Sequence, residues 1–284
     1  MILLDYSQVA HGNLHQQIKG KTDEQELDAT GLRTMILNSI RKNNKQFGKD
    51  YGQMVICVDD HSYWRKMYFP QYKANRKKER DDTGINWTLV YETLDALRDE
   101  LRKHFPYKVI HVPLAEADDI IGVVAKNFHK KEKVLIVSGD KDFIQLQVYP
   151  NVNQFAPVPD EFLTTHDPIR FLKEHIIRGD KKDGVPNFLS PDDILVTKEC
   201  RQKSIFETKL DVWVTQQPEE FCDETTLKNY RRNEKMVDLN QIPSEIQQAI
   251  LEEYDKPIVG DRSKLYGYFV KNRMSNLLEL IRDF

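Results

Sequence analysis

The chain of 284 residues lacks several features that mark common protein classes. It has only three cysteines, Cys57, Cys200 and Cys222, and their wide spacing matches neither a disulfide framework nor a zinc motif. No apolar run approaches the roughly 20 residues that a membrane-spanning helix requires. The apolar start, Met1–Leu4, meets Asp5 at once and is too short for a signal peptide. These absences predict a reduced, cytoplasmic protein without a membrane partner.

Two further absences concern ligands. Neither the Gly-x-Gly-x-x-Gly pattern of dinucleotide-binding domains nor a Walker A loop occurs, which disfavours a nucleotide-binding protein. The chain also has no net positive charge, because 42 lysines and arginines face 45 aspartates and glutamates. This balance does not exclude nucleic acid as a partner, since the distribution of charge matters more than its sum.

Apolar periodicity predicts the fold class. Short runs rich in β-branched residues predict buried parallel strands at Ile2–Leu4, Met54–Val58, Val109–Val112 and Val134–Val137. Apolar residues at three- and four-residue spacing predict helices between and after these strands. The predicted helices are Leu27–Ile40, Trp87–Phe105, Ala117–Phe128, Asp167–Arg178, Pro243–Tyr254 and Lys264–Ile281. The alternation predicts an α/β fold with a central, mostly parallel sheet flanked by helices.

The pattern changes after about residue 150, where helical segments follow without further strands. We therefore predict an α/β catalytic domain over residues 1–155. A helical C-terminal domain over residues 156–284 is expected to pack on it.

Acidic residues follow every predicted strand. In chain order they are Asp5, then Asp59, then Glu116, Asp118 and Asp119, and finally Asp140 and Asp142. In an open parallel sheet the active site lies outside the carboxyl ends of the strands. Four separate segments would therefore deliver acids to one crevice, and Asp180 and Asp183 could join them from the helical half.

Such crowding of carboxylates requires compensation. Two like charges about 4 Å apart repel by about 4 kcal/mol at an effective dielectric near 20. Among the strand-end segments only Lys141 supplies a nearby cation. Oxygen ligands select hard divalent ions, so Mg²⁺ or Mn²⁺ is expected rather than zinc. Two such ions would stabilise the attacking and leaving oxygens of a phosphoryl displacement.

Each acid also has an ordinary structural explanation. An Asp at a strand end can cap the next helix, and Glu116 or Asp119 can complement a helix dipole. Asp180 and Asp183 can pair with the two lysines between them. The metal interpretation is favoured because the structural explanation would have to hold at four or more places at once.

A basic stretch stands apart from these acids. Between Arg65 and Arg80, seven cations face a single acid, Glu79. Aromatic residues are interleaved with them, namely Tyr63, Trp64, Tyr68, Phe69 and Tyr72. Cations hold phosphates, and aromatic faces stack on unpaired bases for roughly 1–3 kcal/mol each. The stretch predicts contact with a single-stranded 5′ end, and the alternative is a solvated helix whose aromatic residues face the core.

The acidic segments Glu116–Asp119, Ser138–Phe143 and Gly179–Asp183 resemble motifs of the flap endonuclease/5′ nuclease family. Tyr72–Arg76 is similar to the arch motif of that family, and the resemblance extends from Asp5 to the end of the chain. It implies a PIN-like fold with an arch at about 61–86. It also implies a helix–turn–helix-like region in the C-terminal part that binds duplex.

The resemblance implies roles for individual residues. The first metal ion would be held by Asp5, Asp59, Asp118 and Asp140, with Glu116 and Asp119 close by. The second would be held by Asp142 and Asp183, with Asp180 acting through water. Phosphates near the scissile bond would be contacted by Arg65, Lys73 and Arg76.

The implied activity is that of a Mg²⁺-dependent 5′-to-3′ exonuclease and flap endonuclease with two metal ions, which Mn²⁺ can replace. Its substrates would be DNA and RNA–DNA hybrids with free 5′ ends or flaps. The resemblance is strongest to phage members that remove RNA primers during lagging-strand replication. It implies a monomer in the host cytoplasm, with a single-strand DNA-binding protein or a sliding clamp as partner.

The chain departs from the family after Asp183. The family places Asn and then a Gly-rich loop there, and in the family that loop grips duplex phosphates with a monovalent ion. This sequence has Gly184 and no Gly-Ile-Gly-type loop. We therefore expect a rearranged duplex contact, and the sequence does not decide whether a monovalent-ion site exists.

Two other functions remain open. A Rossmann-like metal phosphatase or phosphotransferase is disfavoured, because Asp5-Tyr6-Ser7 lacks an Asp-x-Asp motif and the basic aromatic stretch serves no small molecule. A non-catalytic nucleic-acid-binding relative would have lost metal-binding acids. Every acid that the family motif requires is present.

Overall fold

A six-stranded sheet forms the centre of the computed structural model, which describes residues 1–18, 27–196 and 201–284. The strands are β1 (Ile2–Asp5), β2 (Met54–Val58), β3 (Lys108–His111), β4 (Val134–Val137), β5 (Val152–Ala156) and β6 (Glu161–Leu163). Their order is β3-β2-β1-β4-β5-β6, and only β6 is antiparallel to its neighbour. The predicted α/β fold is confirmed, and the four predicted strands form within one residue of their expected bounds. The strands β5 and β6 were not predicted.

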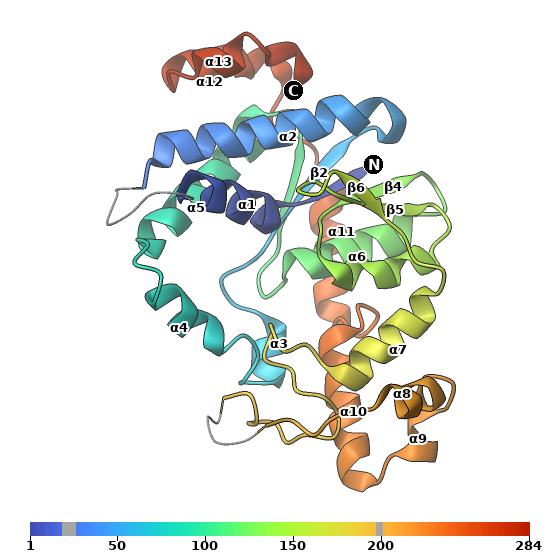
Figure 1. Ribbon diagram of the computed structural model, residues 1–284. Coiled ribbons are helices and arrows are strands. Elements are labelled where there is room, and N and C mark those ends of the chain that lie inside the picture. Colours follow the sequence, from blue (N-terminus) through green and yellow to red (C-terminus); the bar gives the residue numbers. More distant parts are fainter. Residues whose placement is uncertain (19–26, 197–200) are drawn as a thin grey trace.

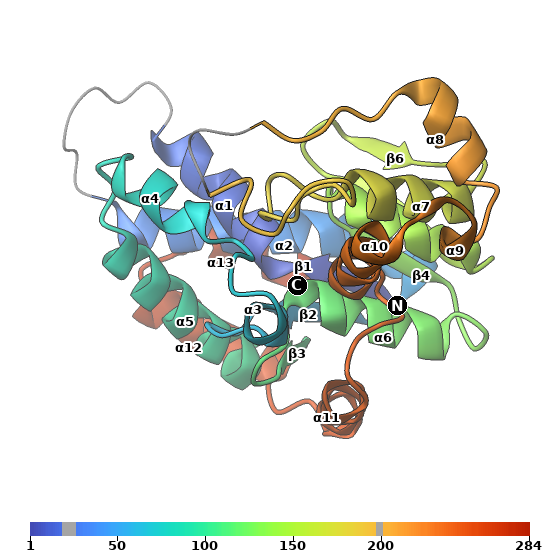
Figure 2. The same ribbon diagram turned by 90° about the horizontal axis from the view of Figure 1, so that it is seen from below.

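Helices cover both faces of the sheet (Figures 1 and 2). On one face lie α1 (Tyr6–Ile18), α2 (Ala29–Tyr51) and α5 (Trp87–His104), and on the other lie α6 (Ala117–Phe128) and α11 (Ser244–Asp255). Strand side chains alternate between the two hydrophobic clusters, so Leu4 packs with the first set of helices and Leu3 with the second. Burial on both faces explains why the strands are continuous apolar runs in the sequence.

The helix α1 begins directly after β1 and was not predicted. Its buried residues Tyr6, Val9, Ala10 and Leu14 recur at helical spacing among polar residues. The Tyr6 hydroxyl donates a hydrogen bond to the Leu94 carbonyl at 2.9 Å, which joins α1 to α5. The first turn of α1 is thereby held at the carboxyl edge of the sheet.

The arch segment contains α3 (Trp64–Tyr68) and α4 (Asn75–Asp81). The C-terminal half contributes α7 (Pro168–Arg178), α8 (Glu207–Trp213), α9 (Pro218–Phe221) and α10 (Glu224–Val237), which lie together in the lower part of Figure 1. A third hydrophobic cluster joins Phe69 and Tyr72 of the arch to Ile177 of α7 and Tyr230 of α10. The base of the arch is therefore packed against the C-terminal half.

The end of the chain returns to the sheet. It forms η2 (Arg262–Lys264), α12 (Leu265–Lys271), α13 (Ser275–Leu278) and η3 (Ile281–Asp283). The single helix predicted over Lys264–Ile281 is broken, because Arg273 adopts a left-handed backbone with φ of 56°. Its apolar residues pack in the core beside α2.

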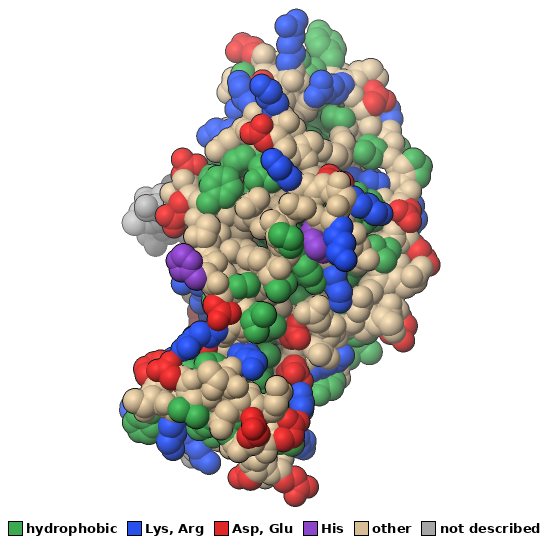
Figure 3. Space-filling view, turned by 90° about the vertical axis from the view of Figure 1, so that its right-hand side faces the viewer, with side chains coloured by type: hydrophobic (Ala, Val, Ile, Leu, Met, Phe, Trp, Pro, Cys, Tyr) green, Lys and Arg blue, Asp and Glu red, His purple; other side chains and the backbone are tan. Residues whose placement is uncertain are grey.

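Two surface properties follow from this packing. None of the helices in the described ranges combines the length and apolar character that a bilayer crossing requires. On the face drawn in Figure 3, lysines and arginines are interspersed with aspartates and glutamates. The net charge of −3 is therefore not concentrated in a single acidic patch on that face.

Candidate active site

Acids from four segments meet at the carboxyl edge of the sheet. Asp5 ends β1, Asp59 follows β2, Asp118 lies in the first turn of α6 after β3, and Asp140 follows β4. Repulsion from Asp59 and Asp140 contributes to a raised pKa of Asp5, and repulsion from Asp140 and Asp5 to a raised pKa of Asp118. The four carboxylates therefore share one electrostatic site. It lies where the strand order reverses between β1 and β4, the usual place for a binding crevice.

Asp5 is the most deeply placed of these four acids. Its side chain accepts hydrogen bonds from the Gln8 amide at 3.0 Å and from the Ser138 hydroxyl at 3.1 Å. Burial, followed by the charge of Asp59, raises the pKa of Asp5 to about 7 despite these bonds. A cation bound beside this carboxylate would stabilise its ionised form, and the proton would be released to solvent.

Asp59 and Asp140 also cap local structure. Asp59 accepts from the Ser7 hydroxyl and from the Ala117 amide at 2.7 Å. Asp140 caps η1 (Lys141–Val148) by accepting from the Asp142 amide at 3.0 Å. A carboxylate offers about four acceptor positions, so capping leaves capacity for a further ligand. The structural and metal-binding interpretations of these residues are therefore compatible.

The four strand-end acids have no cationic partner. In the part of the chain that the structure describes, neither lysine nor arginine forms an ion pair with Asp5, Asp59, Asp118 or Asp140. Burial and Asp140 raise the pKa of Asp118 well above its usual range, and the charge of Lys73 opposes this only in part. A group of crowded oxygen donors without protein cations fits hard divalent ions.

Glu116, in contrast, is fully compensated by the protein. Its side chain is 1% exposed and accepts from Arg65 at 2.8 Å, from the Tyr72 hydroxyl at 3.1 Å and from Lys73. Burial opposes ionisation, but Lys73 and then Arg65 lower the pKa of Glu116. Glu116 therefore anchors the arch segment to the start of α6.

Asp119 and Arg65 form a second buried pair, at 2.8 Å. Asp119 also accepts from the Trp64 indole at 3.0 Å and from the Glu116 amide at 2.9 Å. The Arg65 side chain is 3% exposed and donates to the Met236 carbonyl at 3.0 Å. The structure thus turns Asp119 toward the interior, and it leaves Arg65 almost no surface for the expected phosphate contact.

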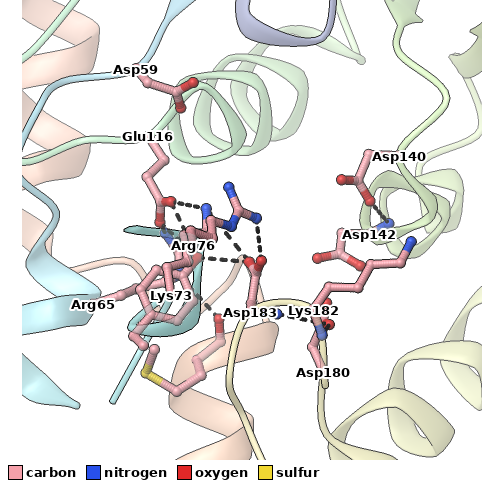
Figure 4. A network of polar contacts seen from close by, with 12 residues as sticks. Asp59, Arg65, Lys73, Arg76, Glu116, Asp140, Asp142, Asp180, Lys182 and Asp183 are labelled. Carbon is pink, nitrogen blue, oxygen red and sulfur yellow. Dashed lines mark hydrogen bonds and ion pairs between the residues drawn. The ribbon is translucent and has the colours of Figure 1, made fainter. Parts of the chain in front are cut away.

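Cations of the arch reach across the site to Asp183. The Asp183 carboxylate accepts from the Tyr72 hydroxyl at 3.1 Å, pairs with Lys73 at 3.5 Å and pairs with Arg76. In Figure 4, Arg76 and Asp183 lie between Glu116 on one side and Asp140 and Asp142 on the other. Arg76 keeps 43% of its side chain exposed, so it remains available to a phosphate.

The loop after α7 needs its two glycines. Gly179 has φ of 67°, and a Cβ there would lie 2.5 Å from the Val185 carbonyl oxygen. Gly184 has φ of 74° and faces the Gln71 carbonyl oxygen. Within this tight loop, Asp180 accepts from backbone amides at 2.8 and 3.2 Å. The acids of the loop pair with His175, Lys73 and Arg76, rather than with the two lysines between them.

His175 is a site residue that the sequence analysis missed. It lies in the last turn of α7, 3.4 Å from Asp142 through Nδ1 and 3.7 Å from Asp180 through Nε2. Burial raises the pKa of Asp142 to about 7, with His175 opposing and the neighbouring acids adding to the rise. The available signal was a histidine one turn before Asp180, in the last turn of a predicted helix.

A cavity of about 540 Å³ opens beside Asp59. Its cationic lining comes from the arch segment and consists of Lys66, Lys73, Arg76 and Arg80. Its aromatic lining comes from α1, the arch and α5 and consists of Tyr6, His11, His15, His61, Tyr63, Trp87 and Tyr91. Cations beside ring faces are the combination that binds unpaired nucleic acid.

Comparison with known proteins agrees with this architecture. A family model described as the 5′-3′ exonuclease N-terminal resolvase-like domain matches residues 1–174. A model described as the C-terminal part of T4 RNase H matches residues 170–284. Ribonuclease H of Enterobacteria phage T4 is 31% identical over 292 aligned residues, which cover 99% of this chain and 95% of that protein.

Two solved structures share the fold. The T5 5′-exonuclease with bound divalent metal ions (zinc) has a TM-score of 0.63 and 14% identity, covering 91% of this chain and 99% of that one. The bacteriophage T5 flap endonuclease in complex with DNA and metal ions has a TM-score of 0.62 and 14% identity, covering 90% and 99%. At this identity the likeness concerns the fold alone.

Proposed function

The chain belongs to the 5′–3′ exonuclease family, and from this premise we propose that it is a Mg²⁺-dependent nuclease that removes RNA primers and 5′ flaps during lagging-strand replication. The observation that carries the proposal is the meeting of Asp5, Asp59, Asp118 and Asp140 without a lysine or arginine partner in the described part of the chain. Asp59 and Asp140 also cap local structure, but the repulsion within the group destabilises the fold unless a cation compensates it.

We propose that these four acids hold one divalent ion, Mg²⁺ or Mn²⁺. Asp142 and Asp183 would hold a second, and Asp180 would act through water. When bound, the ions would supply an activated water and neutralise charge at the phosphate.

Asp183 is paired with protein cations, so it can bind a metal ion only after one of these pairs opens. Its carboxylate is paired with Arg76 and Lys73, and Lys73 is also paired with Glu116. A phosphate that takes over Arg76 would free an oxygen of Asp183. We propose that Lys73 and Arg76 bind phosphates at the scissile bond in this way. Arg65 and Asp119, which are buried against each other, would position the arch and α6 instead of touching substrate.

The cavity beside Asp59 would receive the unpaired 5′ strand. Its cations would bind phosphates, and its ring faces would stack on bases without regard to sequence. Substrate selection would then depend on an unpaired or frayed 5′ end. A DNA complex of the T5 flap endonuclease, which shares the fold, supports DNA as the partner.

Several broader features stay proposals. We propose that the C-terminal part, residues 156–284, contains a helix–turn–helix-like region that binds the duplex, while β6, α11 and α12 of this part pack with the central sheet. The protein would act as a monomer in the host cytoplasm. A single-strand DNA-binding protein or sliding clamp would be its partner.

The test is a cleavage assay on 5′-end-labelled duplexes. Nicked, flapped, overhanging and RNA-primed substrates are incubated with Mg²⁺, with Mn²⁺, or with EDTA. We expect short labelled products with either metal and none with EDTA. Faster release from RNA-primed ends than from DNA ends would support primer removal, whereas no cleavage of any substrate with Mg²⁺ would overturn the proposal.

A further inference from the structure

The cluster of Asp142, His175 and Asp180 differs in chemistry from the strand-end acids. One ligand atom from each of these side chains lies within 4.8 Å of the others. Donors on opposite sides of an octahedral ion are about 4.2 Å apart, from a bond of about 2.1 Å. The three donors therefore need only a small adjustment to share one ion. Unlike the strand-end acids, they include an imidazole nitrogen.

The position of His175 is defined by its helix. The ring of Phe171, one turn earlier in α7, packs edge-on against the imidazole with ring centroids 6.0 Å apart. The helix ends at Gly179, so the partial negative charge of its C-terminus is near the ring and favours a cation there. The structure thus places a side chain that binds transition metals, held by packing, at a place that attracts positive charge.

The Nδ1 atom of His175 has no hydrogen-bond partner among the described residues, although it is buried. It lies 3.4 Å from Asp142, which is outside hydrogen-bonding geometry. A buried polar atom without a partner costs about 1–3 kcal/mol, so native proteins rarely retain one without a function. Coordination of an ion shared with Asp142 would satisfy this nitrogen.

We infer that His175 is a direct ligand of the second metal ion and that the site it forms with Asp142 and Asp180 prefers Mn²⁺ to Mg²⁺. Imidazole suits first-row transition ions, whereas Mg²⁺ prefers carboxylate, carbonyl and water. The inference rests on the proposed function for the role of the ion in cleavage, but the coordination itself can be measured without substrate. It also assigns Asp180 a direct bond to the ion in place of one through water.

The experiment uses the full chain with Mn²⁺ as the probe. Pulsed electron paramagnetic resonance detects nitrogen bound to Mn²⁺, and labelling the histidines with ¹⁵N changes the signal in a predictable way. We expect a histidine nitrogen coupling in the unaltered protein. Mn²⁺ bound through oxygen alone, or no Mn²⁺ binding, would overturn the inference, and no variant is needed for this result.

A pair of variants then identifies the histidine. His175→Gln should abolish the nitrogen coupling and weaken Mn²⁺ binding at one site by about 10- to 100-fold, with a smaller change for Mg²⁺. His166→Gln is the matched control, because His166 is exposed and lies before the same helix. A coupling that survives in His175→Gln would overturn the assignment.

The two experiments distinguish a failure of the His175 inference from a failure of the proposed function. Cleavage with Mg²⁺ combined with oxygen-only Mn²⁺ coordination would reject the His175 inference alone. Nitrogen coordination without cleavage of any 5′-ended substrate would reject the proposed function and leave the metal site in place.

Discussion

Two groups of carboxylates lie at the same edge of the sheet and have opposite surroundings. Glu116 and Asp119 are buried against Arg65, and Lys73 adds a second cation to Glu116. Asp118 lies between them in the sequence, and its pKa is raised by burial and then by the charges of Asp140 and Asp5. Successive residues of a helix point about 100° apart, so neighbours in α6 can serve different partners. The protein neutralises one group with its own side chains, and the other has no lysine or arginine partner among the described residues.

The difference separates acids that stabilise the fold from acids that we propose to bind metal ions. The compensated group joins the arch, α3 and the start of α6 through Arg65 and Lys73. It thereby fixes the helix that presents Asp118. The uncompensated group contributes repulsion that only a bound ion or a proton removes. Substitutions in the two groups should therefore change stability in opposite directions.

The largest expected effect is on catalysis by the uncompensated group. Asp118→Asn and Asp140→Asn should each lower single-turnover cleavage by about 10³-fold, because a catalytic metal ion contributes several kcal/mol. Substrate affinity, measured by fluorescence anisotropy, should be retained, because neither residue is a phosphate-binding cation. Full activity in both variants would show that these acids do not hold the catalytic ion.

The next largest effect is on folding stability, and it tests whether the two groups of acids differ. Glu116→Gln should lower the free energy of unfolding by about 3 kcal/mol, because Arg65 and Lys73 each lose a buried carboxylate and keep only Asp119 and Asp183 as partners. Asp140→Asn is the matched control. In EDTA it should leave stability unchanged or raise it, since it removes repulsion. Urea unfolding measures both, and equal losses would remove the distinction between the groups.

The pH dependence follows from the same comparison. The pKa values of Asp5 and Asp142 are raised from 3.8 to about 7. The folded state therefore binds these protons more tightly than the unfolded state, and stability is lost as pH rises from about 4 to 7. A bound ion replaces the protons, so Mg²⁺ should raise Tm more at pH 8 than at pH 5.5, by on the order of 5 °C. Thermal scans with Mg²⁺ and with EDTA measure the difference, and an equal rise at both pH values would contradict the argument.

The smallest effect is on substrate binding by Arg76, the exposed arginine that lies between the two groups of acids. Arg76→Ala should lower kcat/KM by about tenfold and reduce the salt dependence of binding by about one phosphate contact. Arg102→Ala is the control, because its side chain is similarly exposed, at 38%, and pairs with an acid, Glu253. Salt titrations of both variants on a flapped substrate test this. An equal loss of kcat/KM in both variants would show that Arg76 contributes no more to binding than another surface arginine.

Much of the architecture was predictable from local patterns. The helix α6 has the bounds that its apolar spacing predicted, and the four predicted strands form because each is a run buried on both faces. The helix α1 was missed because its apolar residues are separated by polar ones, and β6 because it is a three-residue edge strand. These elements depend on contacts with distant parts of the chain more than on their own composition.

Four of the six strands, the acids at their ends and the family could be predicted from the sequence alone, because hydrophobic periodicity and the order of motifs are local properties. Only the tertiary structure decided which acid has which partner. It turned Asp119 inward to Arg65, left Asp118 facing other acids, and brought His175 beside Asp142. Electrostatic interactions act between side chains that are close in space, whatever their separation along the chain, so packing alone decides them.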